Sequence, residues 1–204
     1  MLREIFIGRV PSHFHVNTAV KAFIVSESFF WASWNFITPI FAVFAATRVP
    51  GGSVEIAASA YSVHLIVRVI FELISGRRLL KAGELKKYLA AIIGIAILSL
   101  AYLGLAFTAT VAGVYLFYGI AGIGFGIASP AKFSLFSTHL DKNKETIEWG
   151  MYDATVFLFM ALAAALGGFI ASSFGFRILF WASAALNILG IIPYLLYINL
   201  NKSS

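Results

Sequence analysis

The 204-residue chain has no cysteine, only two aspartates and little charge of either sign. The absence of cysteine excludes a disulfide framework, a thiolate metal site and a thiol nucleophile. Asp, Glu, Lys and Arg make up 12% of the residues, about half of the share that is usual in soluble domains. Because so few charges cannot cover a water-facing surface, the composition excludes an ordinary soluble globular domain.

Hydrophobic residues are abundant instead, at 60% of the chain, and the mean hydropathy is +0.90. A helix of about 20 mostly apolar residues is long enough to cross a bilayer. We therefore predict an all-α membrane protein whose six-helix bundle occupies residues 19–200, between a cytoplasmic or interfacial leader at 1–18 and a cytoplasmic tail at 201–204. The predicted spans are 19–46, 56–74, 88–107, 111–136, 150–174 and 178–200.

The basic residues gather in alternate gaps between these spans. Eleven Lys and Arg residues fall in the leader, the second gap, the fourth gap and the tail, whereas only Arg48 and Arg177 fall on the opposite side. Cytoplasmic loops carry such an excess of positive charge. The pattern predicts a multi-pass protein of the cytoplasmic membrane with both termini in the cytoplasm, and it argues against nucleic acid as a partner.

The chain also carries weak signs of an internal repeat. The first and fourth predicted spans each contain a proline near the exit, Pro39 and Pro130, and a polar loop follows about a dozen residues later. The first span starts inside and the fourth starts outside. We therefore expect two inverted three-helix repeats, an arrangement found in many transporters.

The loop after the second span, FELISGRRLLKAGELKKY, carries a partial motif. Gly76, Lys81 and Gly83 have the spacing of a signature in which a glycine is followed by an aspartate, a basic residue and a second glycine. Leu80 stands at the aspartate position, and Glu84 stands where a basic residue is usual. On this loop the chain resembles the amino-terminal six-helix half of the major facilitator superfamily (MFS).

A second match supports the same resemblance. The segment FGFRILFW at residues 174–181 is similar to the start of the sixth helix in many members of the superfamily. The resemblance implies half of an MFS fold, and transport of a small solute by a secondary transporter. Because members normally have twelve helices, a homodimer or a second six-helix half is expected to complete the pathway. The alternative is a non-transporting membrane subunit or scaffold, which the altered motif positions also fit.

The sequence does not predict an enzyme or a cofactor. We find no Gly-x-Ser element with a matching histidine, no run of closely spaced aspartates that could hold a catalytic metal, and no nucleotide-binding loop. The four histidines are scattered, and we expect no metal site.

Polar residues within the predicted spans are the candidates for a solute or proton site. Glu27 and Arg68 lie at matching depth on the first two spans, and His64, Arg68 and Glu72 share one helix face at intervals of four residues. Asn35 adds a polar group nearer the midplane. A carboxylate surrounded by hydrocarbon binds a proton more readily than one in water. Glu27 is therefore either a binding site for a proton or a charged solute group, or half of a fixed ion pair with Arg68.

Three further features receive structural interpretations. Lys132 and Asp153 lie near the predicted cytoplasmic ends of their spans, where we expect an interfacial pair. Asn187 is expected to form a hydrogen bond between helices. Gly122 and Gly126 are expected to form a small-residue face for close helix packing.

Overall fold

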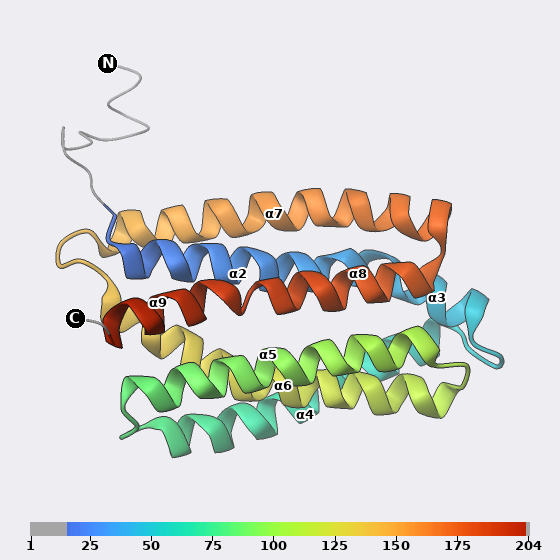
Figure 1. Cartoon of the computed structure of the whole chain (residues 1–204). Helices are drawn as coiled ribbons and strands as arrows, with labels where there is room; N and C mark the ends of the chain where they lie inside the picture. The colour runs from blue at the N-terminus through green and yellow to red at the C-terminus, as the bar shows by residue number, and fades with distance from the viewer. Residues whose placement is uncertain (1–15, 203–204) are drawn as a thin grey trace.

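The computed structural model describes residues 16–202, and the described residues form helices joined by short turns (Figure 1). Six helical stretches are long and apolar enough to cross a membrane, as the sequence predicts. The first and sixth stretches are each interrupted. The elements are α2 (Thr18–Ile37), the 3₁₀ turn η1 (Thr38–Ile40), α3 (Phe41–Arg48), α4 (Val54–Leu79), α5 (Glu84–Phe107), α6 (Val111–His139), α7 (Glu145–Phe174), α8 (Phe176–Leu189) and α9 (Ile192–Lys202).

Polar side chains cap the starts of three of these helices. The Asn17 side chain accepts a hydrogen bond from the backbone N–H of Val20, and Ser53 and Thr110 do the same for α4 and α6. Such caps satisfy backbone donors that lack a partner within the helix. Between α7 and α8 a single residue, Gly175, makes the turn at φ +85°, a conformation that glycine adopts without strain.

The helices lie in two layers (Figure 1). In one layer α2 packs against α7, α8 and α9; in the other, α6 packs against α4 and α5, and contacts between α5 and α8 join the layers. Both ends of the described chain, together with the α4–α5 and α6–α7 turns, lie at the same end of the bundle. We call this the terminal end. The α3–α4, α5–α6 and α7–α8 turns lie at the opposite end.

The helix contacts fit the predicted inverted repeat. The first span packs on the fifth and sixth, and the fourth span packs on the second and third. If spans one, two and three are exchanged with spans four, five and six, these two sets of contacts are exchanged as well. The contact between spans three and six is then unchanged. The first helix of each repeat therefore lies in the layer that contains the other two helices of the opposite repeat.

Several helices extend beyond their predicted bounds. The predicted spans 56–74, 88–107, 111–136 and 150–174 correspond to helices at 54–79, 84–107, 111–139 and 145–174. The added turns contain Arg, Lys, Glu and His, which hydropathy excludes from a span although these residues are compatible with a helix. Most of the expected leader at 1–18 and the end of the expected tail at 201–204 lie outside the described residues.

The breaks in the first and sixth spans occur beside prolines. Pro39 lies in η1, where a 3₁₀ turn separates α2 from α3, and Pro193 follows the turn between α8 and α9. Proline has no N–H for the helical hydrogen bond and therefore interrupts the helix. Pro130, in contrast, lies within the continuous helix α6, so the two prolines of the proposed repeat differ in effect.

Glycines permit the closest helix contacts, as predicted for Gly122 and Gly126. A Cβ atom on Gly122 would lie 2.5 Å from the carbonyl oxygen of His64, and one on Gly126 would lie 2.7 Å from the carbonyl oxygen of Arg68. Both distances are too short for a side chain. These two glycines therefore bring α6 against the backbone of α4.

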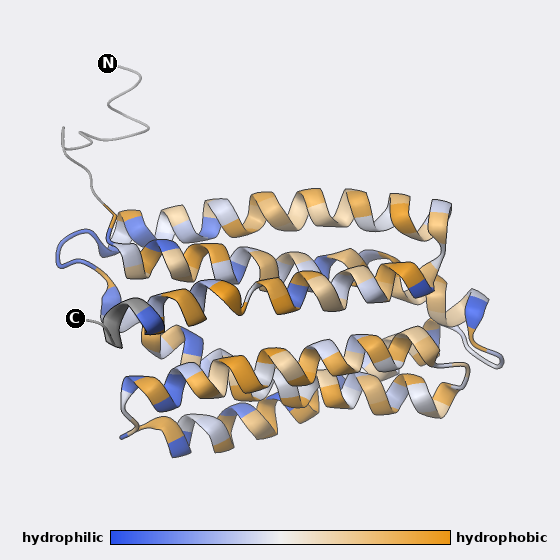
Figure 2. Cartoon of the chain, in the orientation of Figure 1, coloured by the Kyte–Doolittle hydropathy of each residue, from blue (hydrophilic) through white to orange (hydrophobic). Residues whose placement is uncertain are grey.

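The exterior is mostly apolar, and hydrophilic residues gather at the two ends of the bundle (Figure 2). Of the six spans, α4 and α7 have the smallest buried share. Large apolar side chains cover their outer faces, among them Ile66, Leu73, Phe157, Leu162 and Phe169. These faces suit contact with lipid or with another helical protein.

Candidate functional site

Two buried charges form an ion pair between the first and fourth spans. Glu27 on α2 and Lys132 on α6 have side chains that are 3% and 2% exposed. The Lys132 Nζ atom lies 2.9 Å from Oε1 of Glu27 and 3.2 Å from Oε2. It also lies 3.1 Å from the centroid of the Phe30 ring, a cation–π contact. The two charges therefore neutralise each other within an apolar environment.

Two tyrosines complete this cluster, which we call the Glu27 cluster. The hydroxyl groups of Tyr152 on α7 and Tyr194 on α9 donate hydrogen bonds to Oε2 and Oε1 of Glu27, at 3.1 and 3.2 Å. The cluster thus joins spans one, four, five and six. The break in the sixth span is at residues 190–191, and Tyr194 lies in the first turn of α9 after it. The Ser26 hydroxyl donates a 2.5 Å hydrogen bond to the Gly190 carbonyl oxygen at this break.

The predicted partners of Glu27 and Lys132 are wrong. The partner of Glu27 is Lys132 and not Arg68, and Lys132 does not pair with Asp153. Because α6 continues to His139, Lys132 lies about 10 Å along the helix from its end, and its ammonium turns inward. Hydropathy could not give the rotation of one helix relative to another, and this rotation decides which side chains meet.

Of the three polar residues that share one face of the second span, Arg68 and Glu72 form an ion pair. Arg68 Nε lies 3.4 Å from Oε2 of Glu72, and its guanidinium lies 5.0 Å from the centroid of the Phe125 ring. One guanidinium nitrogen lies 3.5 Å from the Ser129 hydroxyl. The Arg68–Glu72 pair is partly exposed, so it makes a weaker contribution than a buried pair.

His64 points toward the first span. Its ring stacks on Trp34 with 4.8 Å between centroids and meets Phe125 edge-on at 5.3 Å. The side chain is buried, and its Nδ1 atom has no hydrogen-bond partner among the described residues. His64 therefore lies in an aromatic cluster, apart from the Glu27 cluster.

The two predicted asparagines have different surroundings. Asn35 donates to the Trp31 carbonyl oxygen of its own helix at 3.0 Å. Asn187 forms the predicted hydrogen bonds between helices: it donates to the Ile95 carbonyl oxygen and to the Ser99 hydroxyl, both at 2.9 Å. Asn187 thus connects the third and sixth spans.

The predicted loop motif lies at the α4–α5 turn. Gly76 is in the last turns of α4 near Pro130 of α6, Lys81 is exposed, and Gly83 directly precedes α5. Glu84, at the start of α5, lies 3.8 Å from Nε2 of His139. The motif residues therefore do not contact the Glu27 cluster.

The α6–α7 turn is tied to the start of the first span. Asn17 donates to the His139 carbonyl oxygen at 2.8 Å and to Oδ1 of Asp141 at 3.0 Å, and Lys144 Nζ lies 3.0 Å from Oδ2 of Asp141. Both donors favour the ionised carboxylate, and they lower the pKa of Asp141 below its ordinary value. The Glu148 carboxylate in turn accepts the backbone N–H of Asp141 at 2.9 Å. This network connects the starts of α2 and α7 with the end of α6 at the terminal end.

A pocket lies beside the Glu27 cluster, between α2, α6 and α7. The cavity has a volume of about 280 Å³, and we call it the α2–α6–α7 pocket. Tyr152 lines this pocket and also donates to Glu27, so a single side chain connects the two. The side chains that give the pocket its character are Trp31, Phe133, Trp149, Tyr152, Asp153 and Phe157.

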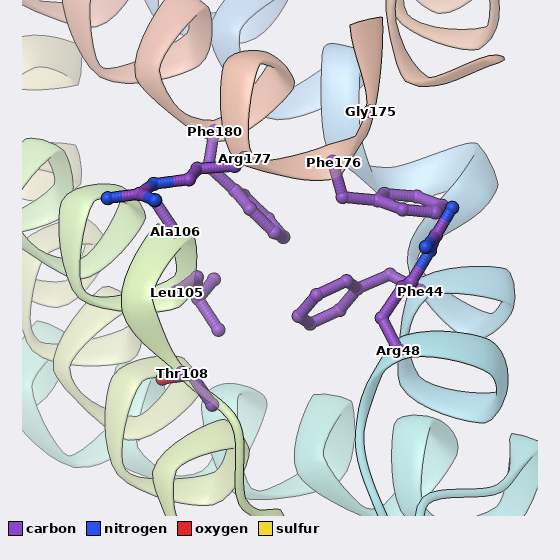
Figure 3. A pocket seen from close by; sticks show the side chains of 9 residues that line it. All are labelled: Phe44, Arg48, Leu105, Ala106, Thr108, Gly175, Phe176, Arg177 and Phe180. Atoms are coloured by element: carbon purple, nitrogen blue, oxygen red, sulfur yellow. The ribbon is translucent and has the colours of Figure 1, made fainter.

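A second pocket, of about 290 Å³, lies at the opposite end of the bundle (Figure 3). Arg48 stacks beside Phe176, with 6.0 Å from the guanidinium carbon to the ring centroid, and Arg177 lies over Phe107 and Trp181. Figure 3 shows the two guanidinium groups on opposite sides of the pocket. They do not converge on one point in it, and their aromatic contacts suit residues that anchor helix ends at a membrane interface.

In this arrangement a buried ion pair lies where the two repeats meet, and an aromatic pocket lies next to it. Sequence reasoning found Glu27 but gave Lys132 an interfacial role, and it singled out neither tyrosine. A tyrosine in an apolar span gives little signal, because its hydroxyl could equally lie at the interface.

Comparison with known proteins identifies the family. No curated protein matches the chain. The family model described as the Major Facilitator Superfamily matches residues 22–204, nearly all of the chain. Members of this superfamily are membrane transporters, not enzymes. The match includes all of the described helices except the first residues of α2, and we conclude that the chain belongs to the major facilitator superfamily.

Proposed function

We propose that this chain moves a small solute across the cytoplasmic membrane as one six-helix half of a secondary transporter. The observation that carries the proposal is the Glu27 cluster, in which a buried ion pair joins the first helix of each repeat. Charges within a membrane span are costly and usually belong to a pathway for a solute or a proton. In this proposal the α2–α6–α7 pocket holds the solute.

Tyr152 is the proposed connection between the solute and the ion pair. Its ring lines the pocket while its hydroxyl binds Glu27. A solute that displaces this side chain would remove one of the hydrogen bonds that satisfy Glu27. Part of the free energy of solute binding would then change the stability of the contact between spans one and four.

Glu27 is the proposed proton-binding group if transport is coupled to protons. Protonation would leave the Lys132 ammonium buried without its counter-ion, which favours a rearrangement of α2 against α6. If transport is not proton-coupled, the same pair serves as a fixed connection between the repeats. The remaining sequence candidates, Asn35, His64, Arg68 and Glu72, lie on the first two spans outside the cluster and do not contact Glu27 in the structure.

A second six-helix unit is part of the proposal, because the pocket opens between helices and is not enclosed by this chain alone. Either a second copy or a separate six-helix half would cover it. The exposed apolar faces of α4 and α7 support such a contact. Native mass spectrometry of the chain in lipid nanodiscs distinguishes a dimer from a monomer, and only the dimer fits transport by two copies of this chain.

Uptake into proteoliposomes tests the function. We would measure radiolabelled glucose, alanine, succinate and benzyltrimethylammonium, with empty liposomes as blanks. We expect uptake of at least one of these solute classes. Glu27→Gln should lower that uptake at least tenfold, while Glu55→Gln, at the exposed start of α4, should leave it unchanged. Absence of flux for all four from a folded dimer would instead support a non-transporting subunit or scaffold.

A further inference from the structure

Asp153 is a carboxylate within a membrane span that has no cationic partner among the side chains of residues 16–199. It lies eight residues after Glu145, or about 12 Å along α7 from the terminal end. Its side chain is exposed, and none of the ion pairs of the described residues includes it. A carboxylate within a membrane span needs a counter-ion or contact with water.

The surroundings of Asp153 are aromatic. Trp31, Phe133, Trp149, Tyr152 and Phe157 line the same pocket, and the rings of Trp149 and Tyr152 lie 5.4 Å apart in an edge-on arrangement. The faces of aromatic rings attract cations, and such rings around a single site are typical of the recognition of quaternary ammonium groups.

Lys132, the cation that the sequence predicts as the partner of Asp153, is not the counter-ion of this pocket. Its ammonium is buried, lies 2.9 Å from Glu27 and is neutralised there. Arg68 is likewise occupied by Glu72 on the second span. Of the charged groups that the structure describes, only Asp153 lines the α2–α6–α7 pocket.

We propose that the α2–α6–α7 pocket binds a small hydrophobic organic cation, with Asp153 as the counter-ion and the aromatic rings around its apolar part. The inference rests on the proposed function in one respect, because it names the substrate class for the pocket in which that proposal places the solute. A cation with an aromatic or alkyl group suits a cavity of about 280 Å³ better than a hydrated inorganic ion.

Binding to the purified full chain in lipid nanodiscs tests this inference without any transport. The probe is benzyltrimethylammonium, measured by isothermal titration calorimetry against empty nanodiscs, and benzylsulfonate is an anion of similar shape. We expect saturable binding of the cation and none of the anion. Asp153→Asn, which keeps the shape of the side chain and removes its charge, should weaken cation binding at least tenfold.

Two further variants separate loss of the site from loss of the fold. Trp149→Leu should also weaken binding at least threefold, while Glu55→Gln should not change it. Thermal unfolding of each variant in the same nanodiscs verifies the fold. Equal binding to the wild type and Asp153→Asn, or equal binding of cation and anion, would overturn the inference.

The result of the binding experiment does not depend on whether the chain transports a solute. Cation binding that depends on Asp153, without flux in proteoliposomes, supports the binding site and removes the proposed function. Flux of a neutral or anionic solute without cation binding keeps the proposed function and removes this inference. If Asp153→Asn abolishes a dimer in native mass spectrometry but leaves cation binding intact, Asp153 pairs with a second copy, and the inference is also overturned.

Discussion

The Glu27–Lys132 pair shows that a buried charge needs a counter-ion beside it. Each side chain is almost fully enclosed, and each is the counter-ion of the other. Loss of one partner from a buried pair costs about 3–5 kcal/mol, because the remaining charge stays uncompensated. Replacement of both costs much less. The stability of this region should therefore depend on the pair and not on either residue alone.

We predict that Lys132→Met lowers the free energy of unfolding by about 3–5 kcal/mol. The double variant Glu27→Gln/Lys132→Met should recover at least half of this loss, because the amide that replaces the carboxylate carries no charge and its oxygen can still accept a hydrogen bond from Tyr152 or Tyr194. Unfolding in detergent with increasing dodecyl sulfate, followed by circular dichroism, measures both. Additive losses in the double variant would show that the pair contributes no coupling energy.

Residue patterns predicted which charged residues lie within the spans, but not which of them form ion pairs. Glu27 and Arg68 satisfied the criterion of equal depth, and Lys132 was assigned to the interface because α6 was expected to end at residue 136. A difference of three residues at a helix end is about 4.5 Å along the helix axis. Asp153 likewise lies farther from the start of its helix than predicted, since α7 begins at Glu145.

At the scale of helices, hydropathy was a good guide because the bilayer requires long apolar segments with satisfied backbone groups. Six spans and a small-residue face on α6 were predicted and are present. The interruption of the sixth span at residues 190–191, before Pro193, was not predicted. Tyr194 follows this interruption in α9 and donates a hydrogen bond to Glu27.

The contact between α4 and α6 depends on glycine, and we predict the effect of a single methyl group. Gly126→Ala would place a Cβ atom 2.6 Å from Cβ of Phe71 on the facing helix, so α4 must shift. We expect a loss of about 1–3 kcal/mol in the free energy of unfolding. Gly119→Ala, on the same helix, meets only a Val63 methyl group at 3.9 Å and should cause no loss. Equal stability of the two variants would contradict the close packing.

On the scale of the whole molecule, the two layers mix helices from both repeats. Span one lies with spans five and six, and span four lies with spans two and three. Neither repeat could keep this arrangement without the other, so the six helices form one unit. The Glu27 cluster lies where the repeats meet, with members from spans one, four, five and six. A relative movement of the layers would change the distances within it.

The distribution of basic residues predicts the orientation of this unit, and the absence of cysteine makes this prediction directly testable. Single cysteines at Ala109, in the turn between α5 and α6, and at Lys142, between α6 and α7, mark the two ends of the bundle. Because cytoplasmic loops attract the excess of Lys and Arg, we expect a membrane-impermeant maleimide to label Ala109→Cys in intact cells. Lys142→Cys should be labelled only after permeabilisation, and the cysteine-free parent provides the blank. Labelling of Lys142→Cys in intact cells would place the terminal end outside and contradict the predicted orientation.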